Sequence, residues 1–378
     1  MLLRVKGNPN NINTPLIGKV TRNPEFLDSN TFLISENGEV IDSIKDCVGI
    51  LSNSSIKNNL NLPTIENVPT FDDLAEGDII VANPDGNINT LYRVNANHNT
   101  LFVTERCNSN CLMCSQPPKN KDDISRLNNI NRKLIPLIPK NCHELGISGG
   151  EPTLMGIHFF ETLEALKVNL PDTEIHVLSN GRSFSRIEMA ERLAKIEYSR
   201  LMIGIPLYSD FYQSHDYIVQ AKDAFNQTII GIHNLARFNQ RIEIRIVLHK
   251  LSIPRLTKLA RYIYKNLPFV EHVTFMGLEY VGYTPYNIEK LWIDPADYIS
   301  ELSEAVEFLA GQGMRVSIYN SQLCVLPENL WEYSRKSISD WKNSYLPECS
   351  KCSKLEQCGG LFTWNLKKHS NRIKAFTT

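Results

Sequence analysis

The residues best suited to chemistry are three cysteines in the segment ERCNSNCLMCSQPPK, residues 105–119. Cys107, Cys111 and Cys114 have the spacing C-x3-C-x2-C, and the segment shows no helical or strand period. Three thiolates at this spacing can hold three irons of a four-iron cluster and leave the fourth iron without a protein ligand. The loop therefore predicts an iron–sulfur centre with one iron open to a cofactor or substrate.

Two other interpretations of this loop are a structural zinc site and a redox pair of the thioredoxin type. Zinc would need a fourth ligand close by, and no nearby His or Cys supplies one. A redox CxxC pair should lie at the start of a helix and has no need of a third cysteine. The spacing therefore favours the cluster over both alternatives.

The elements that must position the loop are strands that alternate with amphipathic helical segments such as SRIEMAERLAKIE. Six buried strand–helix units predict a parallel sheet, either open or curled into a partial barrel. Such sheets place active sites at the carboxyl ends of their strands, and the cysteine loop directly follows the first strand. The strand-like segments are residues 101–104, 144–148, 174–179, 200–209, 241–249 and 272–279.

The composition of the sequence and its pattern of expected elements change on both sides of this array. Residues 1–100 are rich in Asn, Gly and Pro and contain short strand-like runs, which predicts an N-terminal β-rich domain. Residues 101–300 hold the array, and residues 301–378 form a C-terminal region with a cysteine-rich tail. The expected fold class is α/β, with a partial (βα)6 barrel of the TIM type between the two other parts.

The tail contains a second set of thiols. Four cysteines can complete an iron–sulfur cluster, and with one CxxC pair they also suit a tetrahedral zinc site. Cys47 and Cys142 are left over, and packing in an apolar environment is their expected role. The cysteines of the second set are Cys324, Cys349, Cys352 and Cys358.

Composition and charge narrow the class of protein. The N-terminal segment lacks the apolar core of a secretory signal, so we expect a cytoplasmic protein whose nine cysteines stay reduced. No apolar run approaches the roughly 18 residues that span a bilayer, so no membrane association is expected. A formal net charge of -1 gives no overall attraction to nucleic acid, and we expect no nucleic-acid partner.

The segment CNSNCLMC resembles the signature of the radical S-adenosylmethionine (SAM) enzymes. The segments SGGEP, residues 148–152, and LSNGR, residues 178–182, are similar to two further motifs of that family. The resemblance implies a radical SAM core with a 4Fe-4S cluster on the loop cysteines and SAM on the open iron. Reductive cleavage of SAM would yield a 5'-deoxyadenosyl radical that abstracts hydrogen from an unactivated carbon. Simple strand-to-helix turns are the alternative for the two shorter motifs.

The GGE motif of this family grips the methionine amino group of SAM. In this sequence the motif is Gly149, Gly150 and Glu151. Glycines let the backbone approach a ligand closely, and a carboxylate can accept a charge-assisted hydrogen bond from an ammonium group. We therefore expect all three residues to contact SAM.

Four more residues match family positions near the cofactor. The resemblance implies that Asn180 lies close to SAM and that Ser209 contacts its ribose. Arg245 would then contact the SAM carboxylate, and Met113 would pack near the adenine. Ordinary packing at strand ends and in loops is the alternative for these residues. His215 and Asp216, just beyond the fourth strand, could face the substrate, but a solvated loop is the expected position for them.

The tail segment CSKCSKLEQCGG resembles a shortened SPASM or twitch extension, which carries auxiliary clusters in radical SAM enzymes that modify peptides. The resemblance implies that the four tail cysteines bind a second, auxiliary 4Fe-4S cluster. The full SPASM set has seven cysteines for two clusters, so a single cluster of the twitch type fits this tail better. Zinc remains the alternative.

Several segments together resemble the C-type maturases (HxsC-like) of the His-Xaa-Ser peptide system, among them ISGGEPTL, GIPLYSD, HDYIVQA and AFNQTIIGIHNL. The resemblance implies modification of a ribosomally made precursor peptide with His-Xaa-Ser repeats. The implied partners are a second radical SAM maturase and an electron donor such as flavodoxin or ferredoxin. Crosslinking, epimerisation and hydroxylation all begin with hydrogen abstraction, so the bond that is made stays open.

Two other classes of function are also open. One is a radical SAM enzyme that acts on a nucleic-acid base or a small metabolite. The other is a non-enzymatic iron–sulfur or zinc scaffold that binds a partner peptide.

Overall fold

The computed structural model describes residues 4–38, 44, 46–56, 62–337, 339 and 342–377. In this part of the chain no helix combines the length and the apolar character needed to cross a membrane. The chain divides into two compact units. The first comprises Met1–Leu101, Ile124–Leu145 and Glu161–Thr173, and the second comprises Phe102–Asp123, Gly146–Phe160 and Glu174–Thr378.

The N-terminal part of the first unit is a sheet of eight strands in the order β1-β8-β7-β3-β4-β5-β6-β2. Its two outermost strands are consecutive in sequence and meet at Gly7, so the sheet closes on itself. A Cβ atom at Gly7 would lie 2.4 Å from the carbonyl oxygen of Glu66, so only glycine fits at this junction. The strands are β1 (Arg4–Lys6), β2 (Asn8–Asn10), β3 (Leu16–Thr21), β4 (Thr31–Ser35), β5 (Gly49–Ser52), β6 (Thr64–Glu66), β7 (Ile79–Ala82) and β8 (Asn87–Tyr92).

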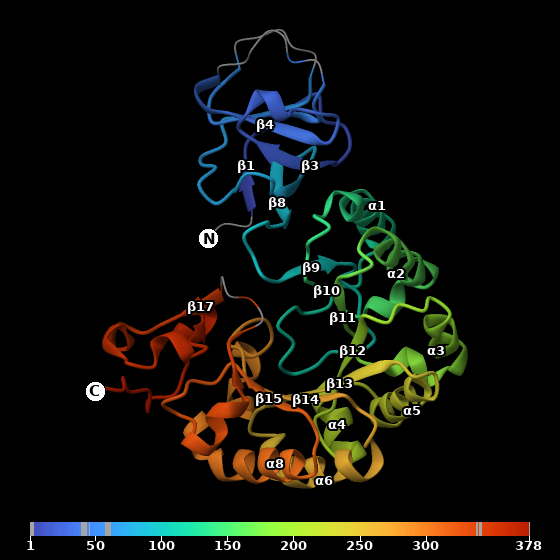
Figure 1. Cartoon of the computed structure of the whole chain (residues 1–378), viewed down its shortest axis with the longest axis vertical. Helices are drawn as coiled ribbons and strands as arrows, with labels where there is room; N and C mark the ends of the chain where they lie inside the picture. Colours follow the sequence, from blue (N-terminus) through green and yellow to red (C-terminus); the bar gives the residue numbers. More distant parts are fainter. Residues whose placement is uncertain are drawn as a thin grey trace. The chain divides into compact units, whose positions relative to one another are not determined.

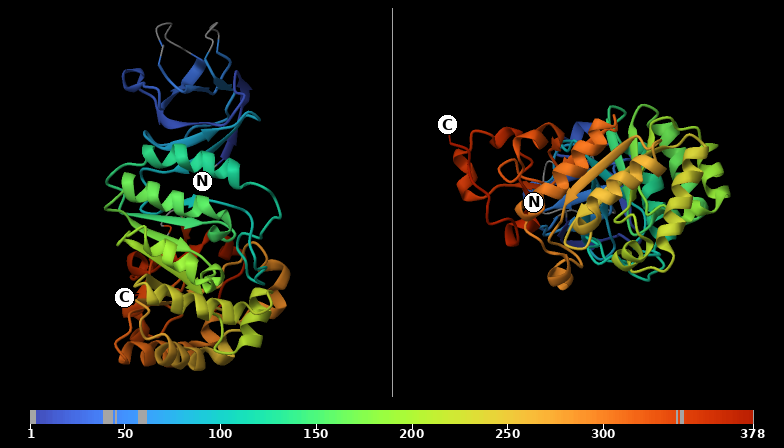
Figure 2. Two further views of the ribbon diagram at one scale, coloured as in Figure 1. Left: turned by 90° about the vertical axis from the view of Figure 1, so that its right-hand side faces the viewer. Right: turned by 90° about the horizontal axis from the view of Figure 1, so that it is seen from below.

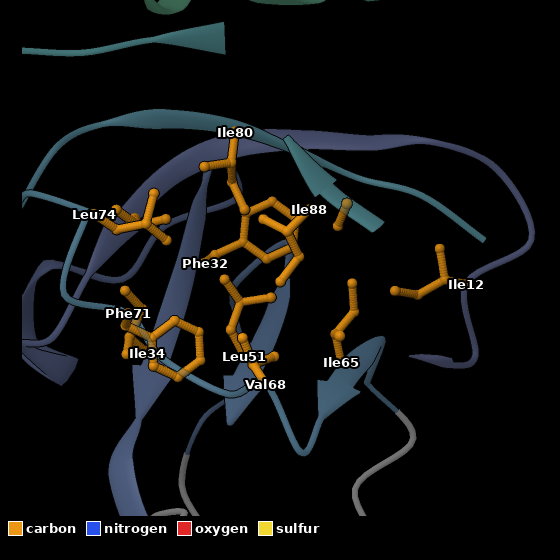
Figure 3. Packing of buried hydrophobic residues seen from close by; sticks show 12 residues of the cluster. Ile12, Phe32, Ile34, Leu51, Ile65, Val68, Phe71, Leu74, Ile80 and Ile88 are labelled. Atoms are coloured by element: carbon orange, nitrogen blue, oxygen red, sulfur yellow. The ribbon is translucent and has the colours of Figure 1, made fainter. Parts of the chain in front are cut away.

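Apolar side chains from these strands form the core of this sheet (Figure 3). Phe32 from β4, Leu51 from β5 and Ile80 from β7 point toward one another in its interior. Every residue of β4 is buried, because a second apolar cluster that includes Leu33 covers the other face. Cys47 packs against that second cluster, in agreement with the apolar environment expected for it.

The second sheet has eight strands in the order β16-β15-β14-β13-β12-β11-β10-β9. Neighbouring strands from β11 to β16 are parallel. All six strands expected from the sequence are present, and β15 and β16 extend the sheet beyond them. The strands are β9 (Asn99–Phe102), β10 (Glu144–Ser148), β11 (Glu174–Leu178), β12 (Leu201–Pro206), β13 (Arg241–Leu248), β14 (His272–Gly277), β15 (Val316–Tyr319) and β16 (Ser334–Arg335).

Helices of the second unit cover the outer side of the curled strands β11–β15 (Figure 1). In Figure 2 they form a layer coloured from yellow-green to orange. Helix α6 buries Leu256, Leu259, Ala260 and Ile263, which recur at the spacing of one helical face. The helices of the whole chain are α1 (Ile124–Leu134), α2 (Ile157–Asn169), α3 (Ile187–Ala194), α4 (Tyr212–Val219), α5 (Ala224–Arg237), α6 (Leu256–Asn266), α7 (Ile288–Leu291) and α8 (Ile299–Gly311).

The cysteine-rich tail consists mainly of short 3-10 turns. Strands β17 (Asn343–Ser344) and β18 (Leu361–Phe362) form an antiparallel pair within it. A small apolar cluster of Val325, Leu361 and Ile373 holds the turns together. The tail therefore depends on few apolar contacts, as is common where metal or disulfide bonds add stability.

Candidate functional site

The loop with Cys107, Cys111 and Cys114 follows β9, and a buried acidic residue closes its base. Asp123 accepts hydrogen bonds from the Thr104 hydroxyl at 2.8 Å and from the backbone N–H of Glu105 at 2.7 Å. Asp123 is 1% exposed. These two bonds join the end of the loop to its beginning, so the cysteines lie in a closed segment.

The three thiols lie close enough together to influence one another electrostatically. Burial is the main cause that raises the pKa of Cys107, to about 11, and the neighbouring Glu151 and Cys114 charges raise it further. Burial also raises the pKa of Cys111, and the other two thiols add to this effect. Thiolates are the metal-binding form, so a bound cation would have to offset the charge that gathers here.

The segment after β10 runs beside the cysteine loop. The backbone N–H of Gly150 donates to the Thr104 oxygen at 2.7 Å, and that of Glu151 donates to the Arg106 oxygen at 2.7 Å. A Cβ atom at Gly149 would lie 2.4 Å from the Thr104 oxygen, and one at Gly150 would lie 2.0 Å from the Arg106 oxygen. The two glycines thus let the cysteine loop pack directly against this segment. From the sequence, we expected them to make room for a ligand.

The Glu151 carboxylate is fully buried and accepts four hydrogen bonds. Its donors are the Thr153 N–H at 3.0 Å, the Thr153 hydroxyl at 2.6 Å, the Ser179 hydroxyl at 2.8 Å and the Asn180 N–H at 2.7 Å. Burial raises its pKa, and these hydrogen bonds act in the opposite direction. Three of these bonds go to Oε1 and one goes to Oε2, so Oε2 can still accept a further donor such as an ammonium group.

The segment after β11 also forms hydrogen bonds with the cysteine loop. Asn180 donates from Nδ2 to the Asn108 side-chain oxygen at 2.6 Å and lies 3.9 Å from the Cys107 sulfur. Arg182 donates to the Asn108 carbonyl and, at 3.0 Å, to the Ser109 hydroxyl. The structure thus brings the three motifs from the sequence together, and side chains of the third motif fix the first half of the loop.

The other expected cofactor residues differ in their surroundings. Met113 is buried in an apolar cluster that also contains Leu112 and Tyr208. Ser209 is buried, and its hydroxyl accepts the Phe211 N–H at 3.1 Å in the turn after β12. Met113 lies within the cysteine loop and Ser209 lies just beyond the end of β12, and each has a local packing or turn role.

Arg245 belongs to a polar network inside the curled sheet. It donates to Glu243 at 2.6 Å, and His272 lies 2.9 Å from the other oxygen of the same carboxylate. Burial of Glu243 acts to raise its pKa, but the His272 hydrogen bond and the Arg245 charge lower it to about 2. Gly204 leaves room for this network, because a Cβ atom there would lie 2.7 Å from His176.

Sequence reasoning missed Tyr208 and misplaced His215. His215 lies in α4 and is 2% exposed, so the expected solvated loop is wrong. Its Nδ1 accepts the Tyr208 N–H at 3.3 Å, and the two rings stack with centroids 5.8 Å apart. Burial raises the pKa of Tyr208, and the charges of Cys111 and Cys114 raise it further, which places this ring beside the thiols.

Residues 101–279 match the model of the Radical SAM superfamily. This stretch is a radical SAM domain. No curated protein matches the sequence significantly. The family match covers the loop cysteines and the strand-end motifs that hold them.

Solved structures of radical SAM enzymes show partial similarity to the chain. Streptococcus suis SuiB bound to S-adenosylmethionine shares 15% identity over 58% of this chain and 49% of that chain, with a TM-score of 0.47. The anSMEcpe enzyme with bound AdoMet shares 18% identity over 58% of this chain and 62% of that chain, with a TM-score of 0.46. HemN from Escherichia coli shares 11% identity over 57% of this chain and 52% of that chain, with a TM-score of 0.43. The chain thus spans less than two thirds of each, and the domain assignment rests on the family model.

Beyond the radical SAM domain, the four tail cysteines line one small cavity. Cys324 contributes to it although it lies 25 residues before Cys349 in the sequence. The rest of the lining is mostly apolar and includes Leu323, Leu355 and Phe376. A shared, largely apolar cavity with four thiols fits an iron–sulfur cluster by its donor set.

Backbone N–H groups point at the sulfurs of this cavity. The Phe376 N–H lies 3.4 Å from the Cys352 sulfur, and the Gly360 N–H lies 3.5 Å from the Cys358 sulfur. The Lys374 backbone also hydrogen-bonds to Cys324. Such donors stabilise thiolates and tune the potential of a cluster.

In the part of the chain that the structure describes, no three His, Cys, Asp or Glu side chains converge tightly enough to share one metal ion. The fit of both cysteine sets to clusters therefore rests on their donor chemistry and surroundings. The loop offers three thiols, and the tail cavity offers four.

Proposed function

We propose that this protein is a radical SAM enzyme that modifies a ribosomally made peptide. The observation that carries the proposal is the cysteine loop, which the segments after β10 and β11 hold beside β9. When bound, a 4Fe-4S cluster and SAM supply reductive cleavage of SAM and a 5'-deoxyadenosyl radical for hydrogen abstraction. Cys107, Cys111 and Cys114 would hold this cluster.

The residues of this chain orient and shield that chemistry. Asp123 closes the base of the loop, and Asn180 and Arg182 fix the position of Asn108 within it. Glu151 holds the Asn180 backbone in place from a fully buried position. A loop fixed in this way can keep its thiols in position when metal and SAM are absent, which reduces the cost of binding them.

We also propose the SAM contacts that the resemblance implies. Gly149, Gly150 and Glu151 would face the methionine amino group. Asn180 would lie beside the cofactor. Further contacts with SAM would come from Ser209, Arg245 and Met113. The hydrogen bonds of Ser209 and Arg245 described above would have to be shared with SAM.

The tail cysteines Cys324, Cys349, Cys352 and Cys358 would hold an auxiliary 4Fe-4S cluster. The shared cavity and the N–H groups that point at its sulfurs support this assignment. Because the resemblance points to the C-type maturases, the proposed substrate is a precursor peptide with His-Xaa-Ser repeats. A second radical SAM maturase and a flavodoxin or ferredoxin would act as partners. The protein would be located in the cytoplasm, where cysteines stay in the thiol form.

The proposal is tested with protein that is reconstituted with iron and sulfide without air. The reduced wild type should convert SAM to 5'-deoxyadenosine, measured by chromatography. Cys111→Ala should abolish this conversion, while Cys142→Ala should retain it because Cys142 is a buried packing residue. Retained cleavage in Cys111→Ala would falsify the cluster assignment. Co-expression with candidate precursor peptides and mass spectrometry then identifies the modified residue.

A further inference from the structure

A carboxylate near the end of β14 has no role in the site described so far. Glu279 lies two residues after the last residue of β14 and is half-buried. Within the described ranges, its carboxylate has neither a hydrogen-bond partner nor an ion-pair partner. Burial raises its pKa, although the charges of Lys342 and Arg245 act to lower it. A half-buried carboxylate without a donor from the protein is free to accept a hydrogen bond from a ligand.

One side chain of the tail fixes the backbone on both sides of Glu279. Asn365 donates from Nδ2 to the Leu278 oxygen at 2.9 Å, and its Oδ1 accepts the Tyr280 N–H at 3.2 Å. A single amide therefore fixes the orientation of the residue between these two contacts. Because the backbone is held on both sides, Glu279 has a defined position at the end of β14.

The segment beyond Glu279 is attached to the cysteine loop. The Tyr283 N–H donates to the Cys114 oxygen at 2.9 Å, and Asn287 donates from Nδ2 to the Leu112 oxygen at 2.9 Å. A Cβ atom at Gly282 would lie 2.2 Å from the Cys114 oxygen, so this contact is tight. Glu279 thus lies on a connection between the tail and the cysteine loop, at the carboxyl end of a strand where parallel sheets bind substrates.

The nearby cations have other contacts. Arg245 is bonded to Glu243 at 2.6 Å, and the Lys342 ammonium lies over the Phe362 ring at 5.9 Å. Among the described residues, neither cation forms a hydrogen bond or ion pair with the Glu279 carboxylate, although the charges of both act to lower its pKa. The Glu279 carboxylate therefore lacks a positively charged hydrogen-bond donor, which is the kind of partner that binds a carboxylate most strongly.

We propose that Glu279 binds a cationic side chain of the substrate, and that Asn365 is the positioning residue for this carboxylate. This inference rests on the proposed function and identifies the residue that would recognise the substrate peptide. In a peptide with His-Xaa-Ser repeats, the cationic group is the protonated imidazole. The Ser of the repeat carries no positive charge, so His is the cationic group that every repeat contains.

Three labelled peptides test this proposal. One carries a His-Xaa-Ser repeat, and the other two carry Lys or Gln in place of His. Fluorescence anisotropy measures their binding to the reconstituted full chain with SAM. The wild type should bind the His and Lys peptides roughly tenfold or more tightly than the Gln peptide, as expected for a charge-assisted hydrogen bond. Glu279→Gln should remove this preference.

Control variants separate recognition from folding. Glu289→Gln changes an exposed carboxylate ten residues further along and should keep the preference. Asn365→Ala should reduce the preference, and adding it to Glu279→Gln should reduce the preference no further. An equal loss of affinity for all three peptides in Glu279→Gln, or a wild type without preference, overturns the inference. SAM cleavage by the wild type without peptide is measured separately, and its absence would count against the proposed function alone.

Discussion

The backbone N–H of Asn180 donates to the carboxylate of Glu151 at 2.7 Å, so a fully buried acid joins the segments after β10 and β11. Asn180 in turn contacts Asn108 in the cysteine loop. This relationship gives Glu151 a structural role in addition to any contact with SAM.

Glu151→Gln should lower the free energy of unfolding by about 2 kcal/mol, because the new amide group faces donors and leaves one of them without an acceptor. Urea unfolding of the metal-free protein measures this change. Glu164→Gln, an exposed position in α2, is the matched control and should have little effect. Unchanged stability in Glu151→Gln would show that the buried carboxylate does not stabilise the site.

Gly150→Ala should disrupt the cysteine loop, because the new methyl group would lie 2.0 Å from the Arg106 oxygen. We expect a loss of at least about 3 kcal/mol in stability or a displaced loop with reduced iron binding. Gly311→Ala is the control, since a Cβ atom there meets nothing within 4 Å and Gly311 ends helix α8. It should be neutral or slightly stabilising, because alanine favours the helix. Iron analysis and urea unfolding of both variants make the comparison.

A variant that lacks all three loop cysteines should still bind about four irons, whereas the wild type should bind about eight. SAM should not perturb the electron paramagnetic resonance spectrum of the cluster that remains, because its irons would all have protein ligands. Zinc in protein purified without air would instead make the tail a structural zinc site. A spectral change on adding SAM would mean that one tail cysteine is not a ligand, and Cys324 would be tested first.

Removal of residues 374–378 should lower the reduction potential of the cluster proposed for the tail, because two N–H donors to the cysteine sulfurs are lost. Each donor that contributes about 1 kcal/mol corresponds to roughly 40 mV for one electron. Phe376→Ala keeps the backbone N–H, so its potential should stay closer to that of the wild type. A redox titration followed by electron paramagnetic resonance measures all three proteins. Equal potentials for the truncated and full chains would argue against these hydrogen bonds.

Stability should fall as the pH drops below 6.5, because two histidines are buried in the neutral form. Burial lowers the pKa of His249 to about 3 and that of His215 to about 4. Below 6.5 the unfolded chain binds protons that the folded chain does not, so each group removes up to roughly 1.4 kcal/mol per pH unit until its folded pKa is reached.

His249→Asn isolates one of these contributions. Its side-chain oxygen can still accept the N–H groups of Leu251 and Ser252, which His249 Nδ1 accepts at 3.2 Å. The variant should therefore fold, and its urea midpoint should depend less on pH between 6.5 and about 4 than that of the wild type. An unchanged pH dependence would show that His249 does not stay neutral in the folded chain.

Much of the sheet and the main motifs could be predicted from local sequence. Cys107, Cys111 and Cys114 lie within eight residues, and β11 to β14 are long enough for their apolar pattern to be visible. Strand β15 was missed because four residues, VSIY, carry too weak a pattern after a long helix. His215 was misplaced because a short helix, α4, begins where the sequence suggested a loop.

The partners that hold the site could not be predicted, because they are distant in sequence. Asp123 lies 19 residues after Thr104, and Asn365 lies 87 residues after Leu278. A polar residue far from any motif gives no signal until the fold brings its partner near. The buried position of Glu151 was hidden for the same reason, since two of its donors lie at the end of another strand.

The closure of the N-terminal sheet at Gly7 limits how that part of the chain can hold an extended peptide. An open sheet has edge strands whose free N–H and C=O groups can pair with an incoming strand. Here β1 pairs with β8 and β2 pairs with β6, and only one residue separates β1 from β2. Among the described strands, this leaves no pair of edges for strand addition. A peptide that docks on this part of the protein would therefore be recognised through side chains and loops on the outside of a closed ring.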